Sequence, residues 1–319
     1  MVTYDGINHE IVDVNGIKMH VAEKGEEGAP IVVFLHGFPE LWYSWKYHIL
    51  ALSSLGYRAV APDMRGYGDT DAPPDAHSYT YGHIVGDIIA LIDKLGAQEV
   101  FVVGHDWGAI IAWWLCLFRP DRVKALVNLS VPFSPRNPHQ NPVDMFRAAY
   151  GDHYYICRFQ EPGEIEDEIA EAGGADKLLR KFFAYRDPGP LFLPKGKAFV
   201  DVPPYPPYLS KEEAAYYLDK FTQISFTGGL NYYRALNLNW ELTAPWTRAR
   251  VLLPVKFVVG DLDLSYNIPG VKEYVNKGGM KKDVPLLEDV VILEGVGHFI
   301  QQEKPDVIVN LIYEFIQKF

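Results

Sequence analysis

Short runs of apolar residues, rich in β-branched and aromatic side chains, recur along the chain and predict seven strands. They cover residues 18–22, 31–35, 58–61, 100–103, 125–129, 255–259 and 290–293. From residue 31 onward the runs are almost continuously apolar, which indicates strands that are covered on both faces. Helical patterns at 81–95 and 109–118 separate several of them. The order strand, helix, strand predicts a parallel α/β sheet.

The alternation of strands and helices stops near Pro132 and resumes at about Val251. Prolines are frequent between residues 188 and 207, and helical segments surround them. One helix is predicted to begin after Ser210, because Glu213 follows at the spacing of a capping box. We therefore predict an inserted helical lid, whose many aromatic side chains pack against the sheet domain.

The composition is that of a globular protein with a large core, since 48% of the 319 residues are hydrophobic. Subtracting 41 acidic from 30 basic residues gives a net charge of -11, which disfavours binding to nucleic acid or to an anionic membrane. The longest apolar run, 109–118, is about half of what a bilayer span requires. The N-terminus has no basic segment followed by an apolar run, so a cytoplasmic location is expected. Cys116 and Cys157 are expected to be reduced thiols.

The stretch Gly104-His105-Asp106-Trp107-Gly108 lies between a predicted strand and an apolar helix. Glycines two positions either side of Asp106 permit the sharp turn that usually presents a nucleophilic serine in hydrolases. The amides at the start of the following helix point to where negative charge develops. Asp106 is therefore a candidate nucleophile, with a carboxylate in place of the hydroxyl.

Three further strand ends carry candidate partners for Asp106. Phe38, in a His-Gly-Phe-Pro stretch, follows a predicted strand and is expected to offer its backbone N–H to an oxyanion. His298 follows the last strand and Asp263 the preceding one, with Asp261 as a rival acid. The carboxyl ends of parallel strands meet at one edge of a sheet, so these groups are expected to lie together. The chain order nucleophile, acid, histidine is that of hydrolases.

The aspartate decides which substrates suit this site. A carboxylate with a reference pKa of about 3.9 is anionic at neutral pH and needs no base before it attacks. Attack on an ester or amide would give a mixed anhydride, whereas attack on an sp³ carbon gives an alkyl ester on Asp106. Water activated by His298, which Asp263 orients, then hydrolyses this ester.

The group that leaves the sp³ carbon is either a halide, held by N–H donors, or the ring oxygen of an epoxide. An epoxide oxygen needs a proton. Tyrosine, with a reference pKa of about 10, keeps its proton at neutral pH and supplies it. The insertion contains many tyrosines, including the pairs at 154–155 and 232–233.

Five stretches are similar to those of plant-type soluble epoxide hydrolases: HGFPE at 36–40, RGYGDT at 65–70, GHDWG at 104–108, YICRFQ at 155–160 and NYYRAL at 231–236. The resemblance extends over essentially the whole chain. It implies an α/β-hydrolase fold, with a mostly parallel eight-stranded sheet, flanking helices and an inserted helical lid. The implied division is a core formed by residues 1–133 and 249–319, and a lid formed by residues 134–248.

The resemblance implies conversion of epoxides to vicinal diols by a triad of Asp106, His298 and Asp263. It also implies that Tyr155 and Tyr233 donate to the epoxide oxygen and that the amides of Phe38 and Trp107 form the oxyanion hole. The residues that it implies bind substrate are His36, Pro39, Trp107, Tyr155 and Tyr233. A cis peptide bond is expected before Pro39. The expected partners are the epoxide and water, without a cofactor or metal, and the chain is expected to be a monomer or a weak homodimer.

Two alternative functions remain at this point. A haloalkane dehalogenase would share Asp106, Trp107 and His298, but it usually has a polar halide ligand after the His-Gly pair, where this chain has Phe38. A non-catalytic receptor for a small molecule on the same fold is the other alternative. The complete set of catalytic residues argues against it.

Overall fold

A computed structural model describes residues 6–319. The expectation of a missing leader depends partly on residues 1–5, which lie outside the described residues. Eight strands form one sheet in the order β1-β2-β4-β3-β5-β6-β7-β8. Strand β2 runs antiparallel to both of its neighbours, β1 and β4. All neighbouring strands in the remainder of the sheet, which has the order β4-β3-β5-β6-β7-β8, are parallel. The bounds are β1 Asn8–Val14, β2 Ile17–Lys24, β3 Ile31–Leu35, β4 Arg58–Pro62, β5 Val100–His105, β6 Val123–Leu129, β7 Val255–Gly260 and β8 Leu287–Leu293.

All seven strands predicted from the apolar runs are present, whereas β1 was not predicted. Strand β1 is mostly exposed, because it forms the edge of the sheet and pairs only with β2. It therefore lacks the apolar run that marks a covered strand. The expectation that the strands after residue 31 are covered on both faces is wrong for β8, which forms the opposite edge and is half exposed.

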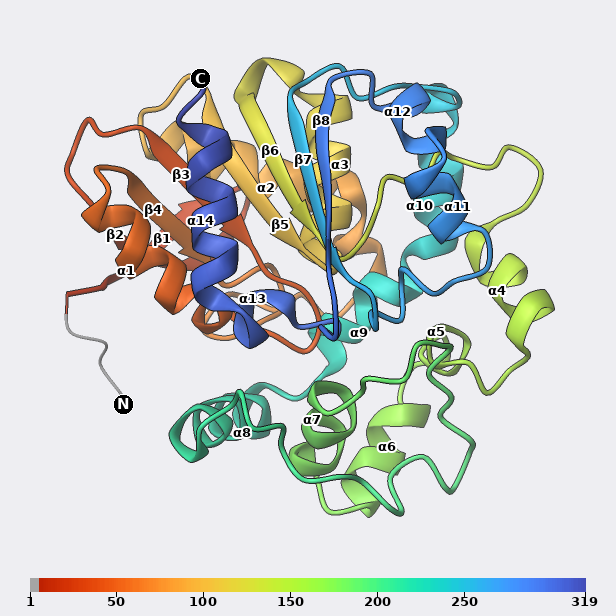
Figure 1. Cartoon of the computed structure of the whole chain (residues 1–319). Helices are drawn as coiled ribbons and strands as arrows, with labels where there is room; N and C mark the ends of the chain where they lie inside the picture. Colours follow the sequence, from red (N-terminus) through yellow and green to blue (C-terminus); the bar gives the residue numbers. More distant parts are fainter. Residues whose placement is uncertain (1–5) are drawn as a thin grey trace.

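Helices cover both faces of the sheet. Helices α1 (Lys46–Ser54) and α14 (Pro305–Ile316) contact each other on the near face in Figure 1, and α2 (Tyr81–Lys94) and α3 (Trp107–Phe118) contact each other on the far face. Short helices follow the last strands: α11 Val271–Asn276, α12 Gly279–Asp283 and α13 Ile300–Glu303. The single-turn 3₁₀ helices are η1 Trp42–Trp45, η2 Ala76–Tyr79, η3 Pro120–Arg122 and η4 Ala244–Trp246.

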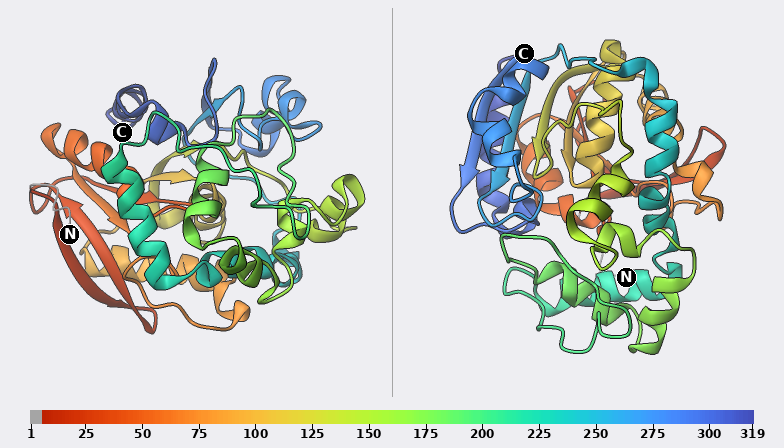
Figure 2. Two further views of the ribbon diagram at one scale, coloured as in Figure 1. Left: turned by 90° about the horizontal axis from the view of Figure 1, so that it is seen from below. Right: turned by 90° about the vertical axis from the view of Figure 1, so that its right-hand side faces the viewer.

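The predicted helical insertion lies between β6 and β7. Its helices are α4 Pro142–Tyr150, α5 Tyr155–Arg158, α6 Glu164–Glu171, α7 Ala175–Phe183, α8 Lys211–Ile224, α9 Thr227–Arg234 and α10 Leu236–Leu242. Helices α5 to α8 gather below the sheet in Figure 1, and the view from below in Figure 2 shows green helices of the insertion across the strand ends. The predicted capping box is present at α8, where Ser210 Oγ accepts from the Glu213 amide (3.2 Å) and Glu213 Oε2 accepts from the Ser210 amide (2.7 Å).

Aromatic and polar contacts fix this insertion to the sheet domain, as the density of aromatic residues predicted. The Tyr43 and Tyr216 rings stack with centroids 4.0 Å apart, and Trp42 Nε1 donates to the Tyr216 hydroxyl (2.9 Å). The buried ion pair of Lys46 and Glu213 lies beside them. In residues 6–319, no helix combines the length and the apolar character that crossing a membrane requires.

Candidate active site

Asp106 occupies a sharp turn between β5 and α3. Its φ of 52° lies in a region that side-chain-bearing residues rarely adopt, and such strain concentrates at functional sites. Two glycines beside it are approached so closely, one by the Asp106 side chain and one by the backbone at the end of β3, that a Cβ would not fit. A Cβ on Gly37 would lie 2.2 Å from Asp106 Oδ1, and one on Gly108 would lie 2.0 Å from the Leu35 carbonyl oxygen. The two glycines thus allow the carboxylate to stand against the loop after β3.

That loop supplies a hydrogen-bond donor to the carboxylate. The Phe38 amide donates to Asp106 Oδ1 at 2.7 Å. The expected cis peptide bond between Phe38 and Pro39 is confirmed. Trp107 is the first residue of α3, so its amide belongs to the helix N-terminus, where backbone N–H groups favour negative charge. One oxygen of Asp106 is therefore held, while Oδ2 is left on the side of His298.

His298 lies between two carboxylates. Its Nε2 is 3.3 Å from Asp106 Oδ2, and its Nδ1 is 3.0 Å from both carboxylate oxygens of Asp263. Asp263 is fully buried and also accepts hydrogen bonds from the amide and hydroxyl of Ser265, both at 2.7 Å. The arrangement brings together three residues from three strand ends and orients the imidazole toward Asp106.

The two carboxylates determine the charge of His298. Burial lowers the pKa of His298, but the charge of Asp263 and the hydrogen bond with Asp106 outweigh it and raise that pKa well above its ordinary value. Burial raises the pKa of Asp263, but the charge of His298 and its hydrogen bonds lower it below the usual range. The imidazole therefore lies between two carboxylates, and this position favours its protonated form.

Asp261, the rival acid, holds the His298 loop. Its Oδ1 accepts from the amides of Gly295 (2.7 Å) and Val296 (3.3 Å), just before His298. The backbone carbonyl of His298 accepts from His105 Nε2 (2.8 Å) and from the hydroxyl of Ser130 (2.9 Å). The loop is thus fixed on both sides of the imidazole, and of the two acids Asp263 is the one hydrogen-bonded to His298.

Tyr155 and Tyr233, at α5 and α9, face the same cavity as Asp106 and His298. Their ring centroids lie 5.8 Å apart. Burial, with the nearby Asp106 charge as a smaller cause, raises the pKa of Tyr233 well above its ordinary value, and burial is also the main reason that the pKa of Tyr155 is raised. Both hydroxyls therefore keep their protons at neutral pH. Of the other members of the two pairs, Tyr232 donates instead to the Arg65 carbonyl (2.9 Å) and Tyr154 packs against Tyr150.

His36 and Pro39 are not among the side chains that line the cavity. His36 is buried, and burial lowers its pKa. Its Nδ1 donates to the Gly37 carbonyl (2.9 Å) and its Nε2 accepts from the Met64 amide (2.9 Å). Both ring nitrogens are thus engaged by backbone, which makes His36 a support for the loop that carries Phe38.

Glu40 is the last residue of the HGFPE stretch at 36–40, and the sequence did not predict a role for it. It is fully buried and accepts from the Gly37 amide (3.1 Å), His105 Nδ1 (2.6 Å) and Gln301 Nε2 (2.6 Å). Burial raises the pKa of Glu40, but the charge and hydrogen bond of His105 outweigh it and lower that pKa to about 2. Glu40 thereby links the loop of the Phe38 amide to the residue beside Asp106 and to α13. The only signal in the sequence was its place directly after His-Gly-Phe-Pro.

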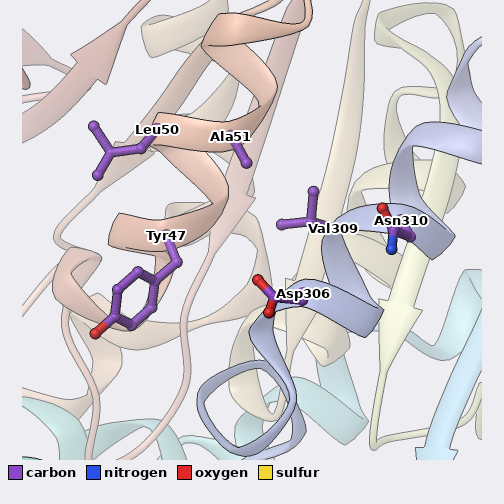
Figure 3. Close-up of a pocket in the computed structure, with 6 residues that line it drawn as sticks. All are labelled: Tyr47, Leu50, Ala51, Asp306, Val309 and Asn310. Carbon is purple, nitrogen blue, oxygen red and sulfur yellow. The ribbon is translucent and has the colours of Figure 1, made fainter.

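The cavity is narrow and mainly aromatic. It is lined by Phe38, Asp106, Tyr155, Phe182, Tyr185, Leu191, Tyr233, Leu264, His298 and Phe299. A wider groove of about 590 Å³ lies on the surface between α1 and α14 (Figure 3). Ala51 and Val309 face each other across it, and Asp306 is its one carboxylate. The groove is more open, but the groups that can perform chemistry converge in the narrow cavity.

Within residues 6–319, one group of three side chains has the spacing of metal ligands: His20, Asp63 and Asp69. His20 Nδ1 is 2.8 Å from Asp63 Oδ2, and the amide of Trp42 donates to the other oxygen of Asp63 (2.9 Å). Asp69 is paired with Lys220 of α8 at 2.6 Å. These atoms already have protein partners, so the group is explained as an ion-pair network between the core and the insertion.

Comparison with known proteins agrees with this geometry. A family described as "alpha/beta hydrolase fold" matches residues 30–162. With the sheet, the turn at Asp106 and the residues at the strand ends, this match defines a protein of the α/β-hydrolase fold, as the resemblance implied.

The chain is 57% identical to "Epoxide hydrolase 2" of Siraitia grosvenorii over 98% of this chain and 99% of the relative. It is 37% identical to "Epoxide hydrolase A" of Mycobacterium tuberculosis over 96% of each chain. The chain belongs to the epoxide hydrolase family, and within it to the plant type.

Solved structures show the same relationship. An epoxide hydrolase from Vigna radiata is 59% identical, with a TM-score of 0.95 over 99% of this chain and 100% of that chain. Epoxide hydrolase I of potato (Solanum tuberosum) is 57% identical, with a TM-score of 0.94 over 98% of this chain and 100% of that chain. The likeness therefore includes the insertion as well as the sheet.

Proposed function

We propose that this protein hydrolyses epoxides to vicinal diols through a covalent alkyl ester on Asp106. One observation carries the proposal. A carboxylate with one oxygen bound to the Phe38 amide and the other 3.3 Å from His298 Nε2 shares a buried cavity with two protonated tyrosines. A nucleophile, a base and acids for a leaving oxygen are thus assembled around one small space.

In the first step, Asp106 Oδ2 attacks a ring carbon of the epoxide, and the bond from that carbon to the ring oxygen breaks. Tyr155 and Tyr233 bind the ring oxygen, and one of them gives it a proton. The raised pKa of both phenols supports this role, because each still carries its proton at neutral pH. The step leaves an ester on Asp106, a hydroxyl on the substrate and one tyrosinate.

Alkylation changes the state of His298. The ester has no negative charge, so one of the two groups that raise the pKa of His298 is lost, and that pKa falls. The proton that His298 then releases replaces the one given up by the tyrosine. Neutral His298, held by Asp263, becomes the base for water.

In the second step, water gives its proton to His298 Nε2 and attacks the carboxyl carbon of the Asp106 ester. The negative charge forms on Oδ1, where the amides of Phe38 and Trp107 serve as the oxyanion hole. Collapse of this intermediate breaks the bond between the carboxyl carbon and Oδ2, which leaves with the substrate. The leaving oxygen takes the proton of the hydroxyl that water added, so that the diol is released, the Asp106 carboxylate is restored and His298 remains protonated. The sum of both steps is epoxide plus water giving diol, which requires no cofactor or metal.

We further propose that residues 1–133 and 249–319 form the catalytic core and that residues 134–248 form the lid. The position of the insertion between β6 and β7 supports this division. Other parts of the proposal are a monomer or weak homodimer, a cytoplasmic location and no binding to nucleic acid or membranes. The net charge of -11 supports the last of these, because it disfavours contact with phosphate backbones and anionic membranes. His36 and Pro39 are proposed to act on the substrate through the shape of the Phe38 loop.

The purified protein is expected to convert styrene oxide to its diol with a turnover in the ordinary enzyme range, on the order of 1 to 10³ s⁻¹. It is expected to release no halide from bromobutane, because the cavity has two tyrosine hydroxyls for an oxygen and an apolar Phe38 after His36-Gly37. Diol is measured by chiral chromatography and halide by ion chromatography. Halide release without diol would favour a dehalogenase, and binding without turnover of either compound would favour a receptor.

A further inference from the structure

Arg186 contacts the loop that carries His298. It follows α7, in the segment of the insertion that crosses to the core. Its Nη2 donates to the carbonyl oxygen of Gly295 at 2.5 Å, and its Nη1 is 2.7 Å from Glu303 Oε2 on α13. A single guanidinium thus holds two points on the core side, one of them three residues before His298.

Glu303 extends this contact to the residue directly before His298. The same oxygen, Oε2, accepts from the amide of Gly297 at 2.9 Å, and the Glu303 side chain is only 11% exposed. Arg186 also lies against Gly297 itself: a Cβ there would be 3.6 Å from both Cγ and Nη1 of Arg186. The backbone of Gly297 is therefore enclosed by the arginine and its carboxylate partner.

The segment that carries Arg186 also forms a wall of the cavity. Tyr185 and Leu191 line it, and the Tyr185 hydroxyl donates to the carbonyl of Pro190 at 3.1 Å, which closes this segment on itself. Movement of the segment away from the cavity would pull the guanidinium from Gly295 and Glu303. The position of this wall and the position of the His298 loop are therefore linked through one side chain.

We propose that Arg186 is a positioning residue that sets the His298 loop when the lid segment is closed, and so supports hydrolysis of the ester more than its formation. This inference rests on the proposed function. The groups that form the ester, Asp106, Tyr155 and Tyr233, belong to the turn after β5 and to α5 and α9. Arg186 holds the loop of the residue that acts in the second step.

The expected effect is moderate. Displacement of a catalytic group by about 1 Å can reduce a rate about 10²-fold. Here His105 and Ser130 still bind the carbonyl of His298, and Asp261 still binds Gly295, after Arg186 is removed. We therefore expect Arg186→Gln to slow ester hydrolysis about tenfold, which is less than the roughly 10²-fold loss for a fully displaced catalytic group.

Steady-state kinetics of Arg186→Gln with styrene oxide separate the two steps. When ester formation commits the substrate, kcat/KM reports the steps up to the ester, and kcat includes its hydrolysis. The expected result is that kcat and KM fall together, about tenfold, while kcat/KM stays unchanged. Intact-protein mass spectrometry of the quenched reaction should show a larger fraction of alkyl-enzyme than the wild type. Glu303→Gln should give the same split to a smaller extent.

Arg180→Gln is the matched control. Arg180 lies on α7 and donates to the carbonyls of Val202 (3.0 Å) and Pro203 (2.8 Å), so its contacts remain within the insertion. It should leave kcat and KM unchanged, and Arg186→Lys should restore part of kcat. Equal loss of kcat and kcat/KM in Arg186→Gln, or an unchanged fraction of alkyl-enzyme, would overturn the proposal. Failure of the proposed function is different, because the wild type itself would then form no alkyl-enzyme.

Discussion

His298→Gln is expected to stop the reaction halfway and leave the substrate bound to Asp106. Asp106 is ionised without help from a base, whereas water needs one before it attacks the ester. Loss of a general base costs about 10² to 10⁴-fold in rate. Glutamine keeps much of the size of the imidazole beside Asp263 but cannot take the proton. Hydrolysis should therefore slow at least about 10³-fold, while ester formation continues.

The measurement is mass spectrometry of His298→Gln incubated with a small epoxide. The protein should gain the whole mass of the epoxide, on a peptide that contains Asp106. Asp106→Asn, incubated in the same way, is the control and should gain nothing. An adduct on another peptide, or wild-type turnover by His298→Gln, would show that the two residues do not divide the steps in this way.

The double change of Tyr155 and Tyr233 to Phe is expected to abolish ester formation almost completely. Each hydroxyl can share the developing alkoxide, so one donor partly replaces the other when it is removed. A single Tyr→Phe change should slow alkylation about 10 to 10²-fold, and the double change about 10⁴-fold, at the upper end for general acid catalysis. Phenylalanine preserves the packing of both rings, so the fold should not change.

Single-turnover quench experiments measure the alkylation rate directly. Tyr232→Phe is the matched control, because it removes the hydroxyl next in sequence to that of Tyr233, which donates to the Arg65 carbonyl and does not face the cavity. It should alkylate at nearly the wild-type rate. If Tyr232→Phe slowed alkylation as much as Tyr233→Phe, the assignment within that pair would be wrong.

Much of this architecture could be predicted from the sequence, because the strands that position the site are buried. Strands β3, β5, β6 and β7 are covered on both faces, and each stands out as an apolar run. Phe38, Asp106 and Asp263 follow the ends of β3, β5 and β7, so the sequence also indicated where they meet. His298 follows β8, which is half exposed but has an apolar run at 290–293. Strand β1 was missed because an exposed edge strand has no reason to be apolar.

The roles that depend on distant contacts could not be predicted in this way. Asp261 and Asp263 stand two residues apart in one motif, and only the fold shows that the first binds the His298 loop and the second the imidazole. Glu40 contacts His105, 65 positions away, and Gln301, 261 positions away. Arg186 contacts Gly295, 109 positions away. Neither carries a local spacing that marks its partner.

The origin of the new oxygen in the diol tests the covalent route most directly. With enzyme in excess over epoxide in ¹⁸O-labelled water, attack by Asp106 should give mostly unlabelled diol in the first turnover and leave the label in the Asp106 carboxylate. Over many turnovers, the diol should become labelled as that carboxylate exchanges. Heavy oxygen in nearly all first-turnover diol, with none in the Asp106 peptide, would show that Asp106 activates water and is not the nucleophile.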